Sequence, residues 1–188
     1  NIERSAITGT LVLQDSAAIQ SSGPIIGQEY LKIKIKTPSD TETEVQNFLE
    51  DVMHIFTLNQ KTPVGNHQLY DVHLITYEQM KNTRTRIKRV LKGSYSDIVT
   101  TLLRDDLKSK KKLFIEPTVG NKKIIPSNMR PFDVISRICA ESVSKENNSP
   151  TYYFYENMKG YHFRSAESIY AQYPKMTYTE KDIPSRTN

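Results

Sequence analysis

The sequence predicts an α+β protein, with an N-terminal antiparallel β-barrel or sandwich followed by a small α/β domain with two helices and a β-hairpin. Residues 1–92 divide into strand-like runs with turns between them, at the spacing of roughly ten residues that is typical of small barrels and sandwiches. After Gly93, two segments carry apolar residues at helical spacing. We therefore expect one domain over residues 1–92 and a second over residues 93–188.

The clearest strand is the segment YLKIKIKTP, residues 30–38. Leucine or isoleucine occupies every second position from residue 31 to residue 35. The positions between them are taken by Lys32, Lys34 and Lys36. Such strict alternation is typical of an antiparallel strand that buries one face. We expect the three lysines on the polar face of a sheet.

Three more strands are expected in this half, within residues 7–16, 45–60 and 69–78. Proline and glycine stand at turn positions between them. The basic segment of residues 81–92 fits a helix and a strand almost equally well. We favour a final strand there, because threonine and arginine alternate along it.

Two helices are expected in the second half, over residues 94–110 and 130–145. Ser94 and Asp97 have capping-box spacing at the start of the first helix, with Asp in place of the usual Glu. Pro131 stands where the first helical residue of the second helix is expected, a position that suits proline.

The segment TYYFYENMKGYHF, residues 151–163, predicts a β-hairpin. Its turn contains Gly160, which readily adopts a positive φ. We expect one aromatic face to pack on the second helix and the other to remain available to a neighbouring chain, an interpretation favoured over base stacking. The candidate packing or inter-subunit aromatic residues are Tyr152, Tyr153, Phe154, Tyr155, Tyr161 and Phe163.

The sequence shows no pattern that predicts an enzyme. The single cysteine, Cys139, falls on the apolar face of the second helix, as is typical of a buried and inert thiol. Asp105 and Asp106 are neighbours on the first helix, so their side chains diverge by about 100° and cannot act as a catalytic pair. The histidines lack metal-ligand spacing, and no glycine-rich phosphate motif occurs. We expect no catalytic residue, no metal and no cofactor.

The basic segment of residues 81–92 contains no acidic residue. It suits contact with phosphates or with a negatively charged protein surface. An alternative function is therefore a nucleic-acid-binding module that uses this segment and the hairpin of residues 151–163. The net charge of +5 is mild for such a module. The partner-facing candidates in the segment are Arg84, Arg86, Lys88 and Arg89.

The ends of the chain suggest that it is a piece of a longer protein. Its 188 residues begin with Asn1 rather than Met and finish in a polar tail without helix or strand pattern. No run approaches the roughly 20 apolar residues of a membrane span. A single cysteine excludes an intrachain disulfide, which fits a reducing compartment.

The order of these features resembles the central baseplate hub protein of contractile-tailed bacteriophages, a group that includes the hub part of type VI secretion spikes. The resemblance rests on residues 8–16, 24–38 and 70–105 in the first part of the chain. Residues 129–142, which read MRPFDVISRICAES, and the hairpin of residues 151–163 complete it.

The resemblance implies a tail-tube-like β-barrel domain followed by an α/β domain. It also implies a non-catalytic homotrimer whose ring joins the tail tube to the central spike, within the tail baseplate of a virion assembled in the host cytoplasm. DNA would meet it only as passing cargo, and the lysines of residues 32–36 would face the lumen or a partner. The hubs of this family carry two tube-like domains per subunit, whereas one is expected here, which supports a fragment of a longer protein.

Overall fold

The structure is a computed structural model. It describes residues 4–16, 29–37, 46–60 and 67–173, together with residues 2 and 23. Of residues 35–37, 46–51 and 60 it describes the backbone alone. The acidic segment expected around residues 39–44, the polar tail from residue 174 onward and the side chain of Lys36 lie outside the described residues.

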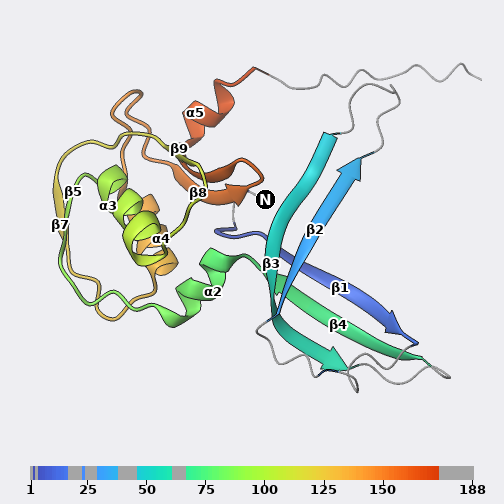
Figure 1. The fold of residues 1–188 in the computed structure, drawn as a ribbon. Coiled ribbons are helices and arrows are strands. Elements are labelled where there is room, and N and C mark those ends of the chain that lie inside the picture. Colours follow the sequence, from blue (N-terminus) through green and yellow to red (C-terminus); the bar gives the residue numbers. More distant parts are fainter. Residues whose placement is uncertain are drawn as a thin grey trace, which may run out of the picture.

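An antiparallel four-stranded sheet forms the N-terminal part of the fold (Figure 1). Its strands are β1 (Thr8–Asp15), β2 (Tyr30–Thr37), β3 (Gln46–Gln60) and β4 (Gln68–Ile75). They are ordered β1-β4-β3-β2, so β1 and β2 are the two edges. The first half of β3 pairs with β2 and its second half pairs with β4. The sheet therefore curls along β3, where a register shift between Ile55 and Thr57 marks an irregularity.

One face of this sheet buries a small hydrophobic cluster. Leu31 and Ile33 of β2 pack against it, whereas Lys32 and Lys34 are exposed, which confirms the predicted alternation. The buried members are Met53, Ile55, Tyr70, Val72 and Leu74. The expected barrel or sandwich is a curled, open sheet within the described residues, because β1 and β2 do not pair with each other.

The strand favoured for the basic segment is wrong in its first part. The chain leaves β4 at Ile75 and forms helix α2 (Tyr77–Arg84). Lys81 and Arg84 lie in the last turn of this helix, where cations interact favourably with the helix dipole. Alternation of threonine and arginine is weak evidence for a strand when no apolar residue alternates with them. A short strand, β5 (Leu91–Gly93), follows only after residue 90.

The second part of the chain combines helices with two small sheets. Its elements are α3 (Tyr95–Thr101), the π-helical turn η1 (Leu102–Asp106), β6 (Leu113–Ile115), β7 (Lys122–Ile124), α4 (Pro131–Glu141), β8 (Tyr152–Asn157), β9 (Gly160–Ser165) and α5 (Ala166–Tyr170). β5 pairs with β7, and β9 lies between β6 and β8 with β6 parallel to it. The capping box of Ser94 and Asp97, Pro131 at the start of α4, and the hairpin are all confirmed.

Helices α3 and α4 pack against the hairpin and form the larger hydrophobic core (Figure 1). Leu102, Leu103 and Ile135 are completely buried there. Ala6 from before β1 and Ile87 from before β5 belong to this core and not to the cluster under the sheet. The chain therefore contributes to the larger core both before it enters the sheet and after it leaves it. The division into two domains at residue 92 stays a prediction. Among the described helices, none has the length and apolar character needed to span a membrane.

A glycine-to-alanine pair tests the hairpin turn. Gly160 has φ of +135°, and a Cβ there would stand 2.0 Å from the Lys112 carbonyl oxygen. Gly120 also has a positive φ, of +75°, but an added Cβ would meet nothing within 4 Å. We expect Gly160→Ala to lower the free energy of unfolding by about 3 kcal/mol or more, and Gly120→Ala by about 1 kcal/mol. Urea denaturation measures both, and equal losses would show that the close approach to Lys112 is unimportant.

Candidate assembly surfaces

The described residues contain no cluster of three or more His, Cys, Asp or Glu side chains that could hold a metal ion. Cys139 is partly buried, and burial raises the pKa of its thiol to about 12, so it is not a thiolate at neutral pH. His73 contacts Thr10 and Asn59, while His54 lies beside Tyr30 and Tyr77. These two histidines therefore have separate neighbours.

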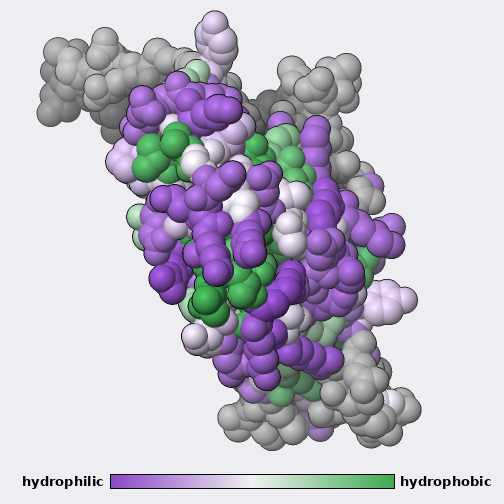
Figure 2. All heavy atoms as spheres, turned by 90° about the vertical axis from the view of Figure 1, so that its left-hand side faces the viewer, coloured by the Kyte–Doolittle hydropathy of each residue, from purple (hydrophilic) through white to green (hydrophobic). Residues whose placement is uncertain are grey.

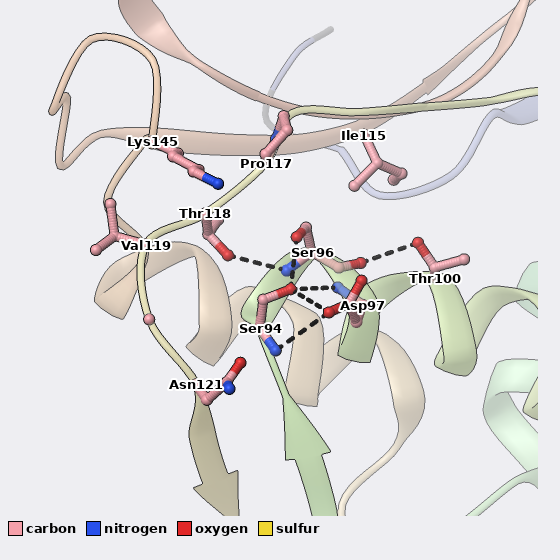
Figure 3. A pocket seen from close by; sticks show the side chains of 11 residues that line it. Ser94, Ser96, Asp97, Thr100, Ile115, Pro117, Thr118, Val119, Asn121 and Lys145 are labelled. Atoms are coloured by element: carbon pink, nitrogen blue, oxygen red, sulfur yellow. Dashed lines mark hydrogen bonds between the residues drawn. The ribbon is translucent and has the colours of Figure 1, made fainter.

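A polar cavity of about 610 Å³ lies at the start of α3 (Figure 3). Its hydroxyl and carboxylate groups mostly bond one another or the backbone. Ser94 Oγ accepts the Asp97 N–H at 3.1 Å, and Thr118 Oγ1 accepts the Ser96 N–H at 3.1 Å. Lys145 reaches the rim from the opposite side. No histidine or cysteine lines the cavity, and Ser94 and Asp97 form the capping box of α3.

The edge strand β1 exposes apolar side chains on both of its faces. Val12 is 55% exposed, while Leu11 and Leu13 on the opposite face are 39% and 38% exposed. β4 pairs with one side of β1 along its whole length, and no described strand pairs with the other side. An eight-residue edge of this kind presents unpaired backbone N–H and C=O groups beside apolar side chains, which natural proteins generally cover or block.

The other edge, β2, has a different character. Tyr30 at its start is 67% exposed. Lys32 and Lys34 follow on the same face, both exposed. The two open edges of one sheet are therefore unlike, since β1 is apolar and β2 combines an aromatic ring with cations.

Two of the four basic candidates, Arg86 and Arg89, are engaged within the chain. Arg86 donates to the carbonyl oxygens of Thr83 and Thr85. Arg89 makes a two-pronged ion pair with Asp106, at 2.6 and 2.7 Å. The hydrogen bond to Asp106 raises the pKa of Arg89, and burial lowers it. The hydrogen bond is the larger effect. Arg84 and Lys88 are exposed.

The face formed by α3, β5 and β7 is mainly hydrophilic, with an apolar area near its middle (Figure 2). Lys92, Lys122 and Lys123 on the paired strands β5 and β7 contribute to its positive charge. Val90 and Ile125, next to these strands, are exposed. A nucleic-acid site that combines the basic segment with the aromatic hairpin stays a prediction.

The inner face of the hairpin is part of the core. Tyr152, Phe154, Tyr161 and Phe163 are buried. Phe154 and Tyr161 stack with ring centroids 5.5 Å apart, and Phe132 of α4 lies against both. The expected packing of one hairpin face on this helix is therefore present, whereas a role of the aromatic residues between subunits stays a prediction.

The outer face carries a row of stacked rings across three strands. His162 of β9 lies between Phe114 of β6 and Tyr155 of β8, with centroid distances of 4.4 and 4.8 Å. Burial and the nearby cations Arg164 and Lys159 lower the pKa of His162 to about 4. The imidazole is therefore neutral at physiological pH, and Lys112 adds a cation over the Phe114 ring at 5.0 Å.

Two buried carboxylates were not singled out from the sequence. Glu116 accepts hydrogen bonds from the Ser144 and Ser165 hydroxyls and from the Ser165 N–H, at 2.6 to 2.8 Å. Glu156 accepts from the Ile7 N–H at 2.8 Å and forms an ion pair with Lys111 at 2.5 Å. Glu156 could have been noticed, because it occupies the same hairpin face as Tyr152 and Phe154, where a charged residue must find partners.

No protein-family model and no curated protein matches the chain. Its structure is similar to that of the 43 kDa tail protein of prophage MuSo2 from Shewanella oneidensis, at 9% identity and a TM-score of 0.48 over 86% of this chain. It is also similar to the E. coli c3393 protein, at 13% identity and a TM-score of 0.49 over 86% of this chain. The latter is described as a type VI secretion component with structural similarity to the T4 bacteriophage tail proteins gp27 and gp5.

The chain spans 46% and 43% of these two proteins, less than half of either. One is a phage tail protein, and the other is a type VI secretion component that is itself similar to phage tail proteins. The chain is thus similar in structure to these two proteins, at low sequence identity. What the chain does must be argued from its own residues and surfaces.

Substitutions on the two hairpin faces should separate packing from surface roles. Phe154→Ala removes a buried ring from the core, and we expect it to lower the free energy of unfolding by about 3–5 kcal/mol. Tyr153 lies on the outer face and is only partly buried, so Tyr153→Ala should cost about 1 kcal/mol. Thermal and urea unfolding measure both. A larger loss for Tyr153→Ala would show that the outer face is the packed one.

Glu116 should give a pH-dependent contribution to stability. Burial acts to raise the pKa of Glu116, but hydrogen bonds from Ser144 and Ser165 outweigh it and hold the pKa below its ordinary value of 4.5. Because the folded-state pKa is lowered, the contribution is present above pH 4.5 and is lost as the pH falls through the folded-state pKa. We expect Glu116→Gln to cost about 1–3 kcal/mol at neutral pH, with the difference from the unsubstituted protein shrinking in acid. A difference that is constant down to full protonation would contradict this.

Proposed function

We propose that this chain is a structural, non-catalytic component of a phage tail, a hub subunit that assembles into a ring through the edges of its sheet. The observation that carries the proposal is the open four-stranded sheet, whose edge strands β1 and β2 are both unpaired on their outer sides within the described residues. The resemblance to tail proteins suggested where to look. The argument that follows rests on the edges themselves.

An open edge with apolar side chains is stabilised by pairing with another strand. Pairing satisfies the backbone groups of β1 and removes Val12 and its neighbours from water. Burial of apolar surface contributes roughly 25 cal/mol per Å². Edge strands that remain monomeric usually carry charges, prolines or bulges that prevent pairing, whereas the central residues of β1, Leu11 to Leu13, are all apolar. β1 is therefore suited to contact with another chain.

The difference between the two edges indicates which copies pair. Joining β2 to β2 would bring Lys32 and Lys34 of two copies close together, and like charges on adjacent strands are unfavourable. Joining β1 of one copy to β2 of the next avoids this and repeats head to tail. Head-to-tail contacts close into a ring when the rotation permits. A trimer is the stoichiometry that the family resemblance implies.

In such a ring the lysines of β2 would face the lumen or an adjoining partner. Tail tube and spike proteins are the partners we propose, with DNA passing through as cargo and the virion baseplate as the location. The α/β part, held to the ends of β1 and β4, would stand beside the ring and carry further contacts.

Self-association through β1 is directly testable. We expect the protein to form oligomers, with a trimer as the closed species, in native mass spectrometry and sedimentation velocity at high protein concentration. Val12→Lys should shift the equilibrium towards monomer by about tenfold or more, because a charge on the edge must be desolvated on pairing.

The matched control is Ile125→Lys. Ile125 is 61% exposed but lies next to β7 and not on the sheet edge. This control should leave the oligomer unchanged. A protein that remains monomeric at every concentration, or equal losses for Val12→Lys and Ile125→Lys, would overturn the proposal.

A further inference from the structure

We propose that a cleft beside the sheet binds an acidic peptide segment of a partner protein. The cleft has a volume of about 710 Å³ and lies between β3, the first turn of α2 and the loop that follows η1. Its lining residues are Val52, His54, Tyr77, Glu78, Lys108, Lys110 and Lys111. They combine an apolar wall, a cationic rim and a carboxylate floor.

The wall is built from the outward face of β3 and the start of α2. Val52 and Tyr77 are each 40% exposed, although both are large apolar or aromatic residues. The ring of His54 lies against that of Tyr77, with centroids 5.8 Å apart. Phe56, two residues further along β3, is 57% exposed. An apolar surface of this extent beside a cleft is suited to receiving a large side chain.

The rim consists of Lys108 and Lys110. Both are exposed, and neither makes an ion pair or side-chain hydrogen bond with another described residue. Lys111 is different, because it is bound to Glu156 at 2.5 Å and to Glu78 at 3.5 Å. The two rim lysines are therefore the cations that the fold leaves for an outside carboxylate.

The floor is Glu78, which is 3% exposed. Its Oε1 accepts the Ser109 hydroxyl at 2.7 Å. Its Oε2 has no hydrogen-bond donor among the described residues, and its nearest cation is the Lys111 ammonium at 3.5 Å. This carboxylate is buried and paired with Lys111, so it helps to hold Lys111 within the fold and leaves contacts with a ligand to the rim and the wall.

The rim and the wall together favour a peptide over a nucleic acid. Phosphates would suit the rim but would leave the apolar wall without a partner. A peptide offers an apolar side chain to Val52 and Tyr77, and Asp or Glu carboxylates to the rim. We therefore infer a segment with one large apolar residue flanked by acidic residues. None of these contacts involves β1 or the outer edge of β2, so the cleft and ring formation can fail independently.

The probe is a set of end-blocked peptides of about ten residues, each with a central Leu, Ile, Phe or Tyr between pairs of Glu. Matched peptides carry Lys in place of Glu. Titration into the ¹⁵N-labelled protein, followed by amide chemical shifts, should move the resonances of Val52, Tyr77 and residues 108–111. At least one acidic peptide should bind, and its basic counterpart should not.

A pair of double variants provides the decisive comparison. Lys108→Asn with Lys110→Gln removes both rim charges, and Asn tolerates the positive φ of 55° at residue 108. Lys122→Gln with Lys123→Gln removes the same charge from β7. We expect the first to weaken peptide binding by about tenfold or more and the second by less than about twofold.

Four outcomes would overturn the proposal. These are no shift with any acidic peptide at millimolar concentration, shifts centred away from the cleft, equal weakening by the two double variants, or tighter binding of a single-stranded oligonucleotide than of every peptide. Circular dichroism confirms that each variant is folded. The oligomeric state, measured on the same samples, separates this result from ring assembly.

Discussion

The carboxylate of Glu156 holds the sheet to the rest of the molecule. Its Oε2 accepts the Ile7 N–H at 2.8 Å and the Thr76 hydroxyl at 3.2 Å, while its Oε1 meets the Lys111 ammonium at 2.5 Å. Ile7 precedes β1 and Thr76 follows β4, and these two strands are paired at Thr8 and Ile75. One buried side chain of the hairpin thus anchors both strands where they enter and leave the sheet. Burial raises the pKa of Glu156, with Lys111 opposing it, and removing one partner of such a pair typically costs about 3–5 kcal/mol.

This anchor decides what the two proposed surfaces can do. Glu156 fixes the start of β1 and the end of β4. The outer edge of β1 therefore has a defined direction relative to α3 and α4, as a repeating assembly requires. The same network determines the charge of the cleft. Lys111 is shared between Glu156 and Glu78, which leaves the neighbouring Lys108 and Lys110 for contacts outside the chain. The ion pairs of Lys111 stabilise the fold, and they also determine that Lys108 and Lys110 are the cations available to a partner.

The sequence predicted the features that depend on neighbouring residues. Alternation around Lys32, the capping box at Ser94 and the hairpin turn at Gly160 are all local, and all three are present. Helix α2 was missed because its residues are mostly polar, so they give no apolar pattern in the sequence. Its stability comes from tertiary contacts. The anchor was missed for a different reason. Glu78 and Glu156 are far apart in the sequence, and only the fold brings them to the same lysine. The exposed wall of the cleft likewise depends on which face of β3 the α/β part leaves uncovered.

Shifted pKa values commonly mark active sites, but the shifts of Glu116, His162 and Cys139 have explanations within the fold. Glu116 is bonded to two serines, His162 is stacked between two rings, and the thiol of Cys139 is protonated by burial. The shifts of these groups are explained by their surroundings within the fold. Lys108, Lys110 and the outer edge of β1 are different, because the described residues leave them without partners. We therefore expect contacts with other molecules at the strand edges and at the cationic cleft.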